Sequence, residues 1–190
     1  MNRRAKRLLD LSLGGAAAVV LAVPALAVAA MVRLTSAGPI IYWSDRIGEG
    51  NRIFRMPKFR SMRVGAPQVA THLLSDPAAH LTPVGGLLRR TSLDELPQLW
   101  SILRGDMSIV GPRPALFNQN DLIALRTALG VHRARPGLTG WAQINGRDEL
   151  AIRDKVALDA DYCRRATVLF DLEIIVRTAV IAVTGRGVSH

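Results

Sequence analysis

The sequence predicts a mainly α-helical fold with a small β component, in which an N-terminal membrane helix precedes one compact domain. Three observations predict this: an uncharged apolar run from residue 11 to 32, leucines at helical spacing after residue 95, and short β-type segments broken by glycines between residues 40 and 54. The chain has 190 residues, enough to bury one hydrophobic core. We therefore divide it into a membrane segment, residues 1–34, and a compact domain, residues 35–190, which form one functional unit.

The apolar run would be about 33 Å long as a straight helix, enough to cross the hydrocarbon core of a bilayer. Basic residues lie on both sides of it, at 3–7 and from Arg33 onward, so the positive-inside bias favours neither orientation. Pro24 removes a backbone hydrogen bond and predicts a bend. A bent helix that enters and leaves by the cytosolic face satisfies both flanks, but prolines are also tolerated in spanning helices. A signal peptide cleaved near Ala25–Ala27 is a third interpretation.

Charge and cysteine content restrict the partners and the compartment. The chain has 25 Lys and Arg against 15 Asp and Glu, a net charge of +10, which favours nucleic acid, anionic lipid or phosphorylated substrates. Its single cysteine, Cys163, excludes an intramolecular disulfide and a zinc cluster of several thiolates. A reducing environment facing the cytosol fits this composition.

The domain after residue 35 is expected to be mainly helical. Short strands are predicted at Ile40–Trp43 and Arg52–Phe54, and residues 65–83 read as a surface excursion. Helical spacing relates Leu96, Leu99, Trp100 and Leu103, and also Leu122, Leu125 and Leu129 before a capping Gly130. The last periodic stretch, residues 169–183, predicts a core or membrane-surface helix that ends at Gly185.

The most informative stretch for chemistry runs from residue 89 to 97. A helix that begins at Asp94 or Glu95 puts Pro97 in the first turn, where its missing N–H costs little. Two adjacent carboxylates then lie at a helix N-terminus, whose dipole and free amides favour anions, so Asp94 can stay ionised and nucleophilic while a phosphate is attracted. In the alternative interpretation, Asp94 is only an N-cap and Glu95 only complements the helix dipole.

Three basic segments are candidates for binding phosphate. Lys58 and Arg60 flank Phe59, which we expect to pack inward, and the two cations can neutralise a pyrophosphate. Arg113 lies between two prolines and a glycine, which present its guanidinium rigidly. Arg147 ends a turn-rich loop that begins at residue 136. A solvated basic strand, a surface ion pair and ordinary turn chemistry are the alternatives.

In combination these segments resemble the small monotopic phosphoglycosyl transferases, the bacterial sugar transferase family that starts glycan assembly on polyprenol phosphate. The resemblance covers nearly the whole chain and lies in motifs that occur in the family's order. They are Lys6–Asp10 before the apolar run, Lys58–Met62, Thr91–Leu103 continuing through Arg104–Ser108 to Gly111–Pro114, the loop Pro136–Arg147, and Leu158–Asp159 with Tyr162.

The resemblance implies a reaction and roles for these residues. Asp94 would attack the sugar-bearing phosphate of a UDP-sugar and expel UMP, with Glu95 assisting through Mg²⁺ that both carboxylates bind. Polyprenol phosphate would then attack the covalent aspartyl sugar-phosphate. By the same resemblance, Lys58, Arg60, Arg113, Arg147 and Asp159 form the substrate phosphate-binding set, with Asp159 orienting the cations or the metal.

The resemblance also implies how the chain meets the membrane. The family's re-entrant helix is hinged at a serine-proline pair; this sequence has Val23–Pro24, which keeps the proline as the membrane hinge and loses the hydroxyl. We therefore expect a re-entrant helix and a catalytic domain on the cytosolic face of the bacterial inner membrane. UDP-sugar, polyprenol phosphate and membrane lipids are the expected partners, and nucleic acid is not.

A basic, membrane-anchored protein that binds nucleic acid or lipid without catalysis is the competing hypothesis. It accounts for the net charge of +10 and for the anchor. It gives no reason for adjacent carboxylates at Asp94 and Glu95. Nothing in the sequence fixes the sugar, the glycan pathway or the oligomeric state.

Overall fold

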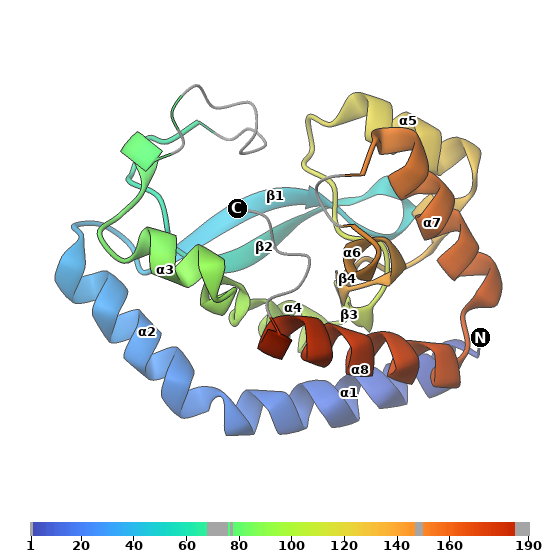
Figure 1. Ribbon diagram of the computed structural model, residues 1–190, viewed down its shortest axis with the longest axis horizontal. Helices are drawn as coiled ribbons and strands as arrows, with labels where there is room; N and C mark the ends of the chain where they lie inside the picture. Colours follow the sequence, from blue (N-terminus) through green and yellow to red (C-terminus); the bar gives the residue numbers. More distant parts are fainter. Residues whose placement is uncertain (1, 68–75, 77, 147–149, 185–190) are drawn as a thin grey trace.

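The computed structural model describes residues 2–67, 76, 78–146 and 150–184 (Figure 1). It is mainly helical with two small two-stranded sheets, which confirms the predicted fold class at that level. The α-helices are α1 (Arg3–Val20), α2 (Ala22–Thr35), α3 (Gly85–Arg90), α4 (Gln98–Arg104), α5 (Asn120–Ala128), α6 (Trp141–Ile144), α7 (Ile152–Arg165) and α8 (Val168–Thr184). The strands are β1 (Ile41–Ile47), β2 (Ile53–Phe59), β3 (Ser108–Val110) and β4 (Gly137–Thr139), and short 3-10 turns are η1 (Glu49–Asn51), η3 (Ala78–His80), η4 (Leu93–Glu95) and η5 (Val131–Arg133).

The apolar run forms two helices, α1 and α2, which meet at Leu21 with a bend of 59°. Pro24 is the third residue of α2, so its missing N–H falls in the first turn, where no intrahelical bond is lost. A continuous helix would need residue 24 to donate to Val20, which proline cannot do, and the predicted bend is confirmed. Among the described residues, no single helix satisfies the length and hydropathy requirements of a membrane span, whereas this bent pair does.

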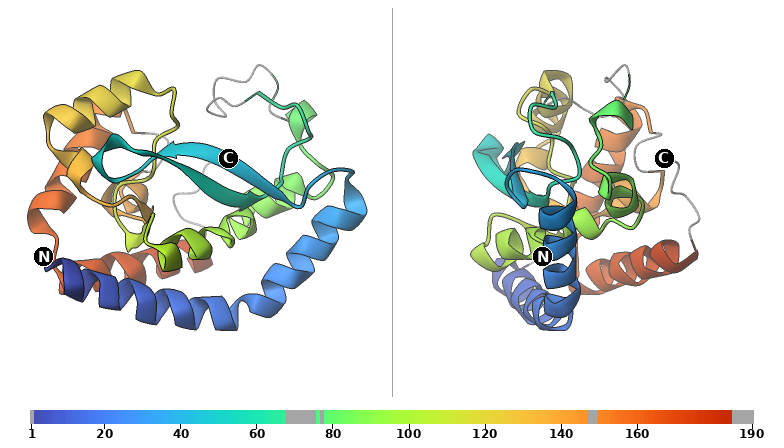
Figure 2. Two further views of the ribbon diagram at one scale, coloured as in Figure 1. Left: turned by 180° about the vertical axis from the view of Figure 1, so that it is seen from behind. Right: turned by 90° about the vertical axis from the view of Figure 1, so that its left-hand side faces the viewer.

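Both outer ends of the bent pair are fastened to the same body, as Figures 1 and 2 show. On α1, Gly14 is buried, and a Cβ there would lie 3.3 Å from the Ile102 side chain, so the missing side chain lets α4 approach closely. On α2, Val28 and Val32 are buried in one cluster with Phe59 and Leu88. The apolar side chains around the bend remain more than two-thirds exposed: Val19, Val20, Val23 and Leu26.

Polar contacts tie the start of α1 to the rest of the protein. Lys6 donates to the buried carboxylate of Asp171 on α8 at 2.6 Å, and α8 lies alongside α1 (Figure 1). Arg7 donates to two backbone carbonyls at the end of α4. Asp10, fully buried, accepts from the Ser108 hydroxyl at 2.8 Å. The motif before the apolar run therefore has a structural role: it anchors the start of α1 to α4, α8 and the start of β3.

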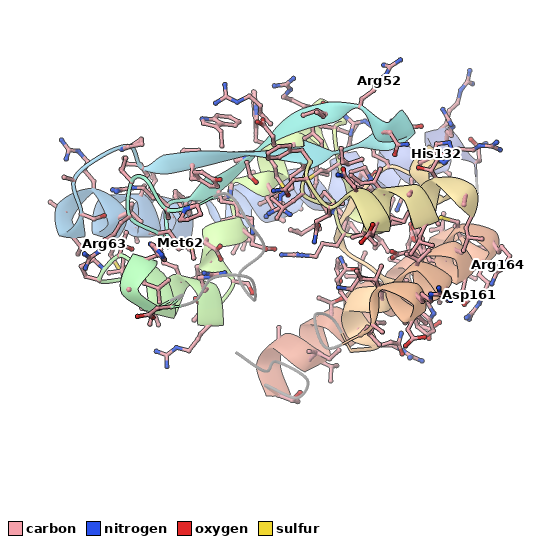
Figure 3. The ribbon with its side chains drawn as sticks, turned by 90° about the horizontal axis from the view of Figure 1, so that it is seen from above. Arg52, Met62, Arg63, His132, Asp161 and Arg164 are labelled. Atoms are coloured by element: carbon pink, nitrogen blue, oxygen red, sulfur yellow. The ribbon has the colours of Figure 1, made fainter. Side chains whose placement is uncertain are left out.

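The hairpin of β1 and β2 is longer than the two short strands that the sequence predicts. Its antiparallel register pairs Tyr42 with Lys58 and Arg46 with Phe54. The connecting turn, η1, has positive φ at Gly50 and Asn51, which reverses the chain tightly. Arg52 follows this turn and points away from the body (Figure 3). Phe59, at the other end of β2, is buried as predicted.

A second, parallel pair, β3 with β4, was outside the predictions because each strand has only three residues. Other elements agree better with the sequence. The helix α5 is followed by Gly130 at φ 75°, which confirms the predicted cap. The predicted C-terminal helix is α8, whose Phe170 and Ile174 are buried with Val110 and Tyr162. Gly185, its predicted end, lies outside the described residues.

Candidate active site

Asp94 and Glu95 lie in η4, a single 3-10 turn, and not at the start of an α-helix. The expected helix begins only at Gln98, with Pro97 as its N-cap, because proline cannot donate the bond that would join the turn to α4. The turn is entered through Ser92 in left-handed conformation, φ 55°. The amide of Glu95 donates to the Ser92 carbonyl. The prediction that free helix-terminal amides attract the phosphate is therefore wrong for Glu95.

Side-chain cations take the place of those amides. Lys58 Nζ donates to Glu95 Oε1 at 2.8 Å and lies 3.9 Å from Asp94 Oδ2. Arg113 Nη2 donates to the same Glu95 oxygen at 2.7 Å. The three carboxyl and ammonium side chains are at most 15% exposed. The structure thus brings together residues from three segments that the sequence nominated separately: the pair Asp94 and Glu95, Lys58, and Arg113.

Two rigid segments set these cations in place. Lys58 is the penultimate residue of β2, and the burial of Phe59 beside it fixes which way the strand faces. Arg113 follows β3 in the Gly111–Pro114 loop. A Cβ at Gly111 would lie 2.5 Å from the carbonyl oxygen of Arg135. Only glycine therefore allows the backbone segments at residues 111 and 135 to approach this closely. The amide of Gly137 donates to the carbonyl of Pro112 at 2.9 Å, which holds the loop against β4.

The two carboxylates have pKa shifts of opposite sign. Burial raises the pKa of Asp94; Lys58 opposes this and Glu95 reinforces it. Burial also acts to raise the pKa of Glu95, but the charges and hydrogen bonds of Arg113 and Lys58 outweigh it and hold that pKa well below its usual range. Neighbouring titratable groups whose pKa values are shifted in opposite directions are typical of sites where the two groups have different chemical roles. These shifts favour the ionised form of Glu95, which holds two cations, and leave Asp94 as the more basic carboxylate of the pair.

Asp159 lies on α7 and is linked through Arg126 to the Gly111–Pro114 loop. Its carboxylate, 1% exposed, accepts from Arg126 Nε and Nη2 at 3.0 and 2.6 Å. Arg126 also donates to the backbone carbonyl of Arg113 at 2.8 Å. Burial raises the pKa of Asp159, and Arg126 opposes the rise. Asp159 therefore holds Arg126, a residue outside the predicted set, and contacts the Arg113 loop only through it; its predicted role of orienting the phosphate-binding cations or the metal stays a prediction.

Arg60 is not brought together with Asp94 and Glu95. Its side chain is buried and donates to backbone carbonyls of Ser36, Ala37 and Pro39, just after α2 ends. These bonds hold the segment that follows α2 and place a positive charge near the C-terminal end of the helix, where the helix dipole is negative. We interpret Arg60 as a cap that joins α2 to the hairpin. Arg147 lies outside the described residues.

Sequence reasoning did not nominate two arginines that the structure places beside the site, Arg46 and Arg126. Arg46 shares a face with Lys58, because residues that pair across an antiparallel ladder point to the same side. Period-two alternation from a longer predicted strand would have indicated this. Arg126 lies on α5, 33 residues from its partner Asp159, so no local pattern connects the two.

The carboxylates of Asp94 and Glu95 would bind Mg²⁺ only together with oxygen ligands from a phosphorylated substrate. Within the described residues, no group of three or more His, Cys, Asp or Glu side chains gathers to hold a metal. Asp94 and Glu95 supply adjacent hard oxygens, although Glu95 Oε1 is shared by two cations. Mg²⁺ is commonly held by one or two carboxylates together with substrate phosphates. This pair therefore suits a metal that arrives with a phosphorylated substrate.

Comparison with known proteins shows the family to which the sequence is similar. The family model described as bacterial sugar transferase matches residues 1–185. A UDP-glucose:undecaprenyl-phosphate glucose-1-phosphate transferase of Xanthomonas campestris pv. campestris is 42% identical over 82% of this chain and 34% of its own length. The exopolysaccharide production protein ExoY of Sinorhizobium fredii is 36% identical over 96% of this chain and 87% of its own.

A third relative broadens the range of sugars. The UDP-N-acetylgalactosamine-undecaprenyl-phosphate N-acetylgalactosaminephosphotransferase of Aeromonas hydrophila is 35% identical over 90% of this chain and 43% of its own length. The chain thus spans less than half of the Xanthomonas and Aeromonas relatives and most of ExoY. With nearly its whole length matched by one family model, the chain belongs to the bacterial sugar transferase family.

Proposed function

We propose that this protein transfers a sugar 1-phosphate from a UDP-sugar to undecaprenyl phosphate and releases UMP. The observation that carries the proposal is the buried pair Asp94 and Glu95, with opposite pKa shifts, beside Lys58 and Arg113. Basic groups of this kind offset the charge that would otherwise keep a carboxylate away from a diphosphate. The names of the relatives, which specify UDP-sugars and undecaprenyl phosphate, support the same substrates.

The reaction proceeds in two displacements at one phosphorus atom. A carboxylate oxygen of Asp94 attacks the phosphorus that carries the sugar, and the bond from that phosphorus to the bridging oxygen breaks, so UMP leaves with that oxygen. An oxygen of undecaprenyl phosphate then attacks the aspartyl sugar-phosphate. The bond to Asp94 breaks, which restores the carboxylate and gives undecaprenyl diphosphate sugar.

The remaining groups serve this sequence. Lys58 and Arg113 neutralise phosphoryl oxygens, and Glu95 holds both cations in place. Asp94 and Glu95 would hold Mg²⁺ together with the substrate phosphates, and the metal would supply further charge neutralisation. The sugars named for the relatives are glucose and N-acetylgalactosamine, so the proposal leaves the sugar open.

We further propose that α1 and α2 form a re-entrant membrane helix, with the catalytic domain on the cytosolic face of the bacterial inner membrane. The support is that both outer ends pack on one body, through Asp10 and Gly14 on α1 and Val28 and Val32 on α2. A spanning helix would send these ends to opposite faces of the bilayer. The exposed apolar side chains gather around the bend, where they would contact lipid.

A screen of UDP-sugars for UMP release tests the function. Detergent-extracted protein is incubated with Mg²⁺, undecaprenyl phosphate and each UDP-sugar in turn, with Asp94→Asn as the control. We expect one or a few UDP-sugars to yield UMP and the variant to yield none. Absence of UMP from every UDP-sugar, with protein shown to be folded, would contradict the proposal and favour a nonenzymatic binding protein.

A further inference from the structure

Arg46, on β1, reaches from the hairpin to the Gly111–Pro114 loop. Its Nε donates to the Ser44 hydroxyl at 3.0 Å, and its Nη1 donates to the carbonyl of Pro114 at 3.1 Å. Pro114 directly follows Arg113, so these bonds bring the two guanidinium groups to the same loop. Arg46 shares its face of the hairpin with Lys58, about 13 Å away along the strand at 3.3 Å per residue.

In the part of the chain that the structure describes, Arg46 forms no ion pair within 4.0 Å, and its two hydrogen bonds go to neutral oxygens. Its Nη2 makes no hydrogen bond there either. Burial and the neighbouring Arg113 lower the pKa of Arg46 to about 10, although Glu95 acts in the opposite direction. A desolvated cation next to a second cation is unfavourable unless an anion joins them.

The arrangement of these charged side chains indicates where a phosphate of the substrate would bind. Asp94 lies at one end, beside Lys58, and Glu95 joins Lys58 to Arg113. Arg46 contacts the residue that follows Arg113 and lies near enough to Arg113 to lower its own pKa. In a nucleoside diphosphate sugar, the phosphate under attack lies at Asp94. The next phosphate, which bears the nucleoside, then extends toward Arg113 and Arg46.

We propose that Arg46 is a third cation of the substrate site and binds the nucleoside phosphate, the group that departs as UMP. This inference rests on the proposed function. Loss of a charge-assisted hydrogen bond to a phosphate should weaken binding of UMP about 10- to 100-fold. Undecaprenyl phosphate attacks after UMP has left, so its KM should stay within about twofold.

The experiment uses the full-length protein in detergent and measures the Kd of UMP by calorimetry and the KM of undecaprenyl phosphate by turnover. Arg46→Gln should show the loss of UMP affinity. Ser44→Ala removes a bond that holds Arg46 but keeps its charge, and Arg55→Gln removes an equal charge from the outer face of the hairpin, where Arg55 lies against Trp43. Both controls should bind UMP within about threefold of the unmodified protein.

Modification of the unaltered protein removes any dependence on how Arg46→Gln folds. Phenylglyoxal labelling, mapped by peptide mass spectrometry, should show that UMP protects Arg46 and leaves Arg55 reactive. Equal UMP affinity in Arg46→Gln, an equal loss in Ser44→Ala, or no protection of Arg46 would each overturn the inference. If the unaltered protein neither binds UMP nor releases it from any UDP-sugar, the proposed function itself has failed.

Discussion

Replacing Asp159 by Asn tests whether this carboxylate positions Arg113 indirectly, by holding Arg126. The change keeps the shape of the side chain but leaves Arg126 as a buried cation, because that side chain is 10% exposed and Asp159 is its ion-pair partner. Breaking one partner of a buried pair costs about 3–5 kcal/mol. For a protein of this size, each kcal/mol lowers Tm by about 2–4 °C, so we expect a decrease of about 6–20 °C.

The assay is thermal unfolding in detergent together with steady-state kinetics. Asp159→Asn should also raise the KM for UDP-sugar, because Arg126 donates to the carbonyl of Arg113 and would no longer be held. The double variant Arg126→Met with Asp159→Leu removes both charges. It should recover most of the lost stability, yet keep the raised KM, because the carbonyl of Arg113 still lacks its donor.

One outcome would refute this reasoning. If Asp159→Asn changes Tm by less than about 3 °C but abolishes turnover, Asp159 acts directly on the reaction and not through Arg126. A double variant less stable than Asp159→Asn would equally contradict the interpretation of a destabilising unpaired charge.

The remaining predictions concern Asp94 as the nucleophile, the pH dependence of turnover, the Lys6–Asp171 ion pair and the membrane topology of α1 and α2. Asp94→Asn should abolish UMP release without lowering Tm in a melting experiment, because burial that raises the pKa of Asp94 makes its charged form unfavourable in the folded state; a large loss of Tm would indicate a structural role. For the same reason, kcat/KM should decrease as the pH falls through the pKa of Asp94, which lies above 3.8, and a rate that stays constant down to pH ~4 would contradict this. Lys6→Met removes the cation from the buried Asp171 carboxylate, which keeps its hydrogen bond from Tyr162, so Tm should decrease by about 6–20 °C, and an unchanged Tm would show that the ion pair is not stabilising. In a Cys163→Ser background, cysteines at Arg3 and Arg52 should both resist a membrane-impermeant thiol reagent from the periplasmic side, and labelling of only one would establish a spanning helix.

Much of the site could be predicted because its chemistry lies in short motifs. Asp94 and Glu95 are neighbours in sequence, and Pro97 limits where the following helix can begin. The bend was equally local, since Pro24 cannot donate its backbone bond. Local rules thus identified both the carboxylate pair and the hinge.

The errors have physical causes as well. Lys58 and Arg60 have the same charge and lie two residues apart, yet Lys58 reaches Glu95 and Arg60 caps the end of α2. This difference depends on tertiary contacts that begin 20 or more residues away. Arg126 meets Asp159 only when α5 and α7 pack, and Arg46 reaches the Pro114 carbonyl only across the loop. Long-range pairing of this kind leaves no trace in local periodicity.

Initial-rate kinetics test the central claim, that Asp94 forms a covalent sugar-phosphate before undecaprenyl phosphate reacts. The concentrations of UDP-sugar and undecaprenyl phosphate are varied together, and the rate of UMP release is measured. If Asp94 is the nucleophile, UMP leaves before the lipid attacks, so the double-reciprocal lines should be parallel. Intersecting lines would indicate a ternary complex with direct transfer, and would remove Asp94 from the role of nucleophile.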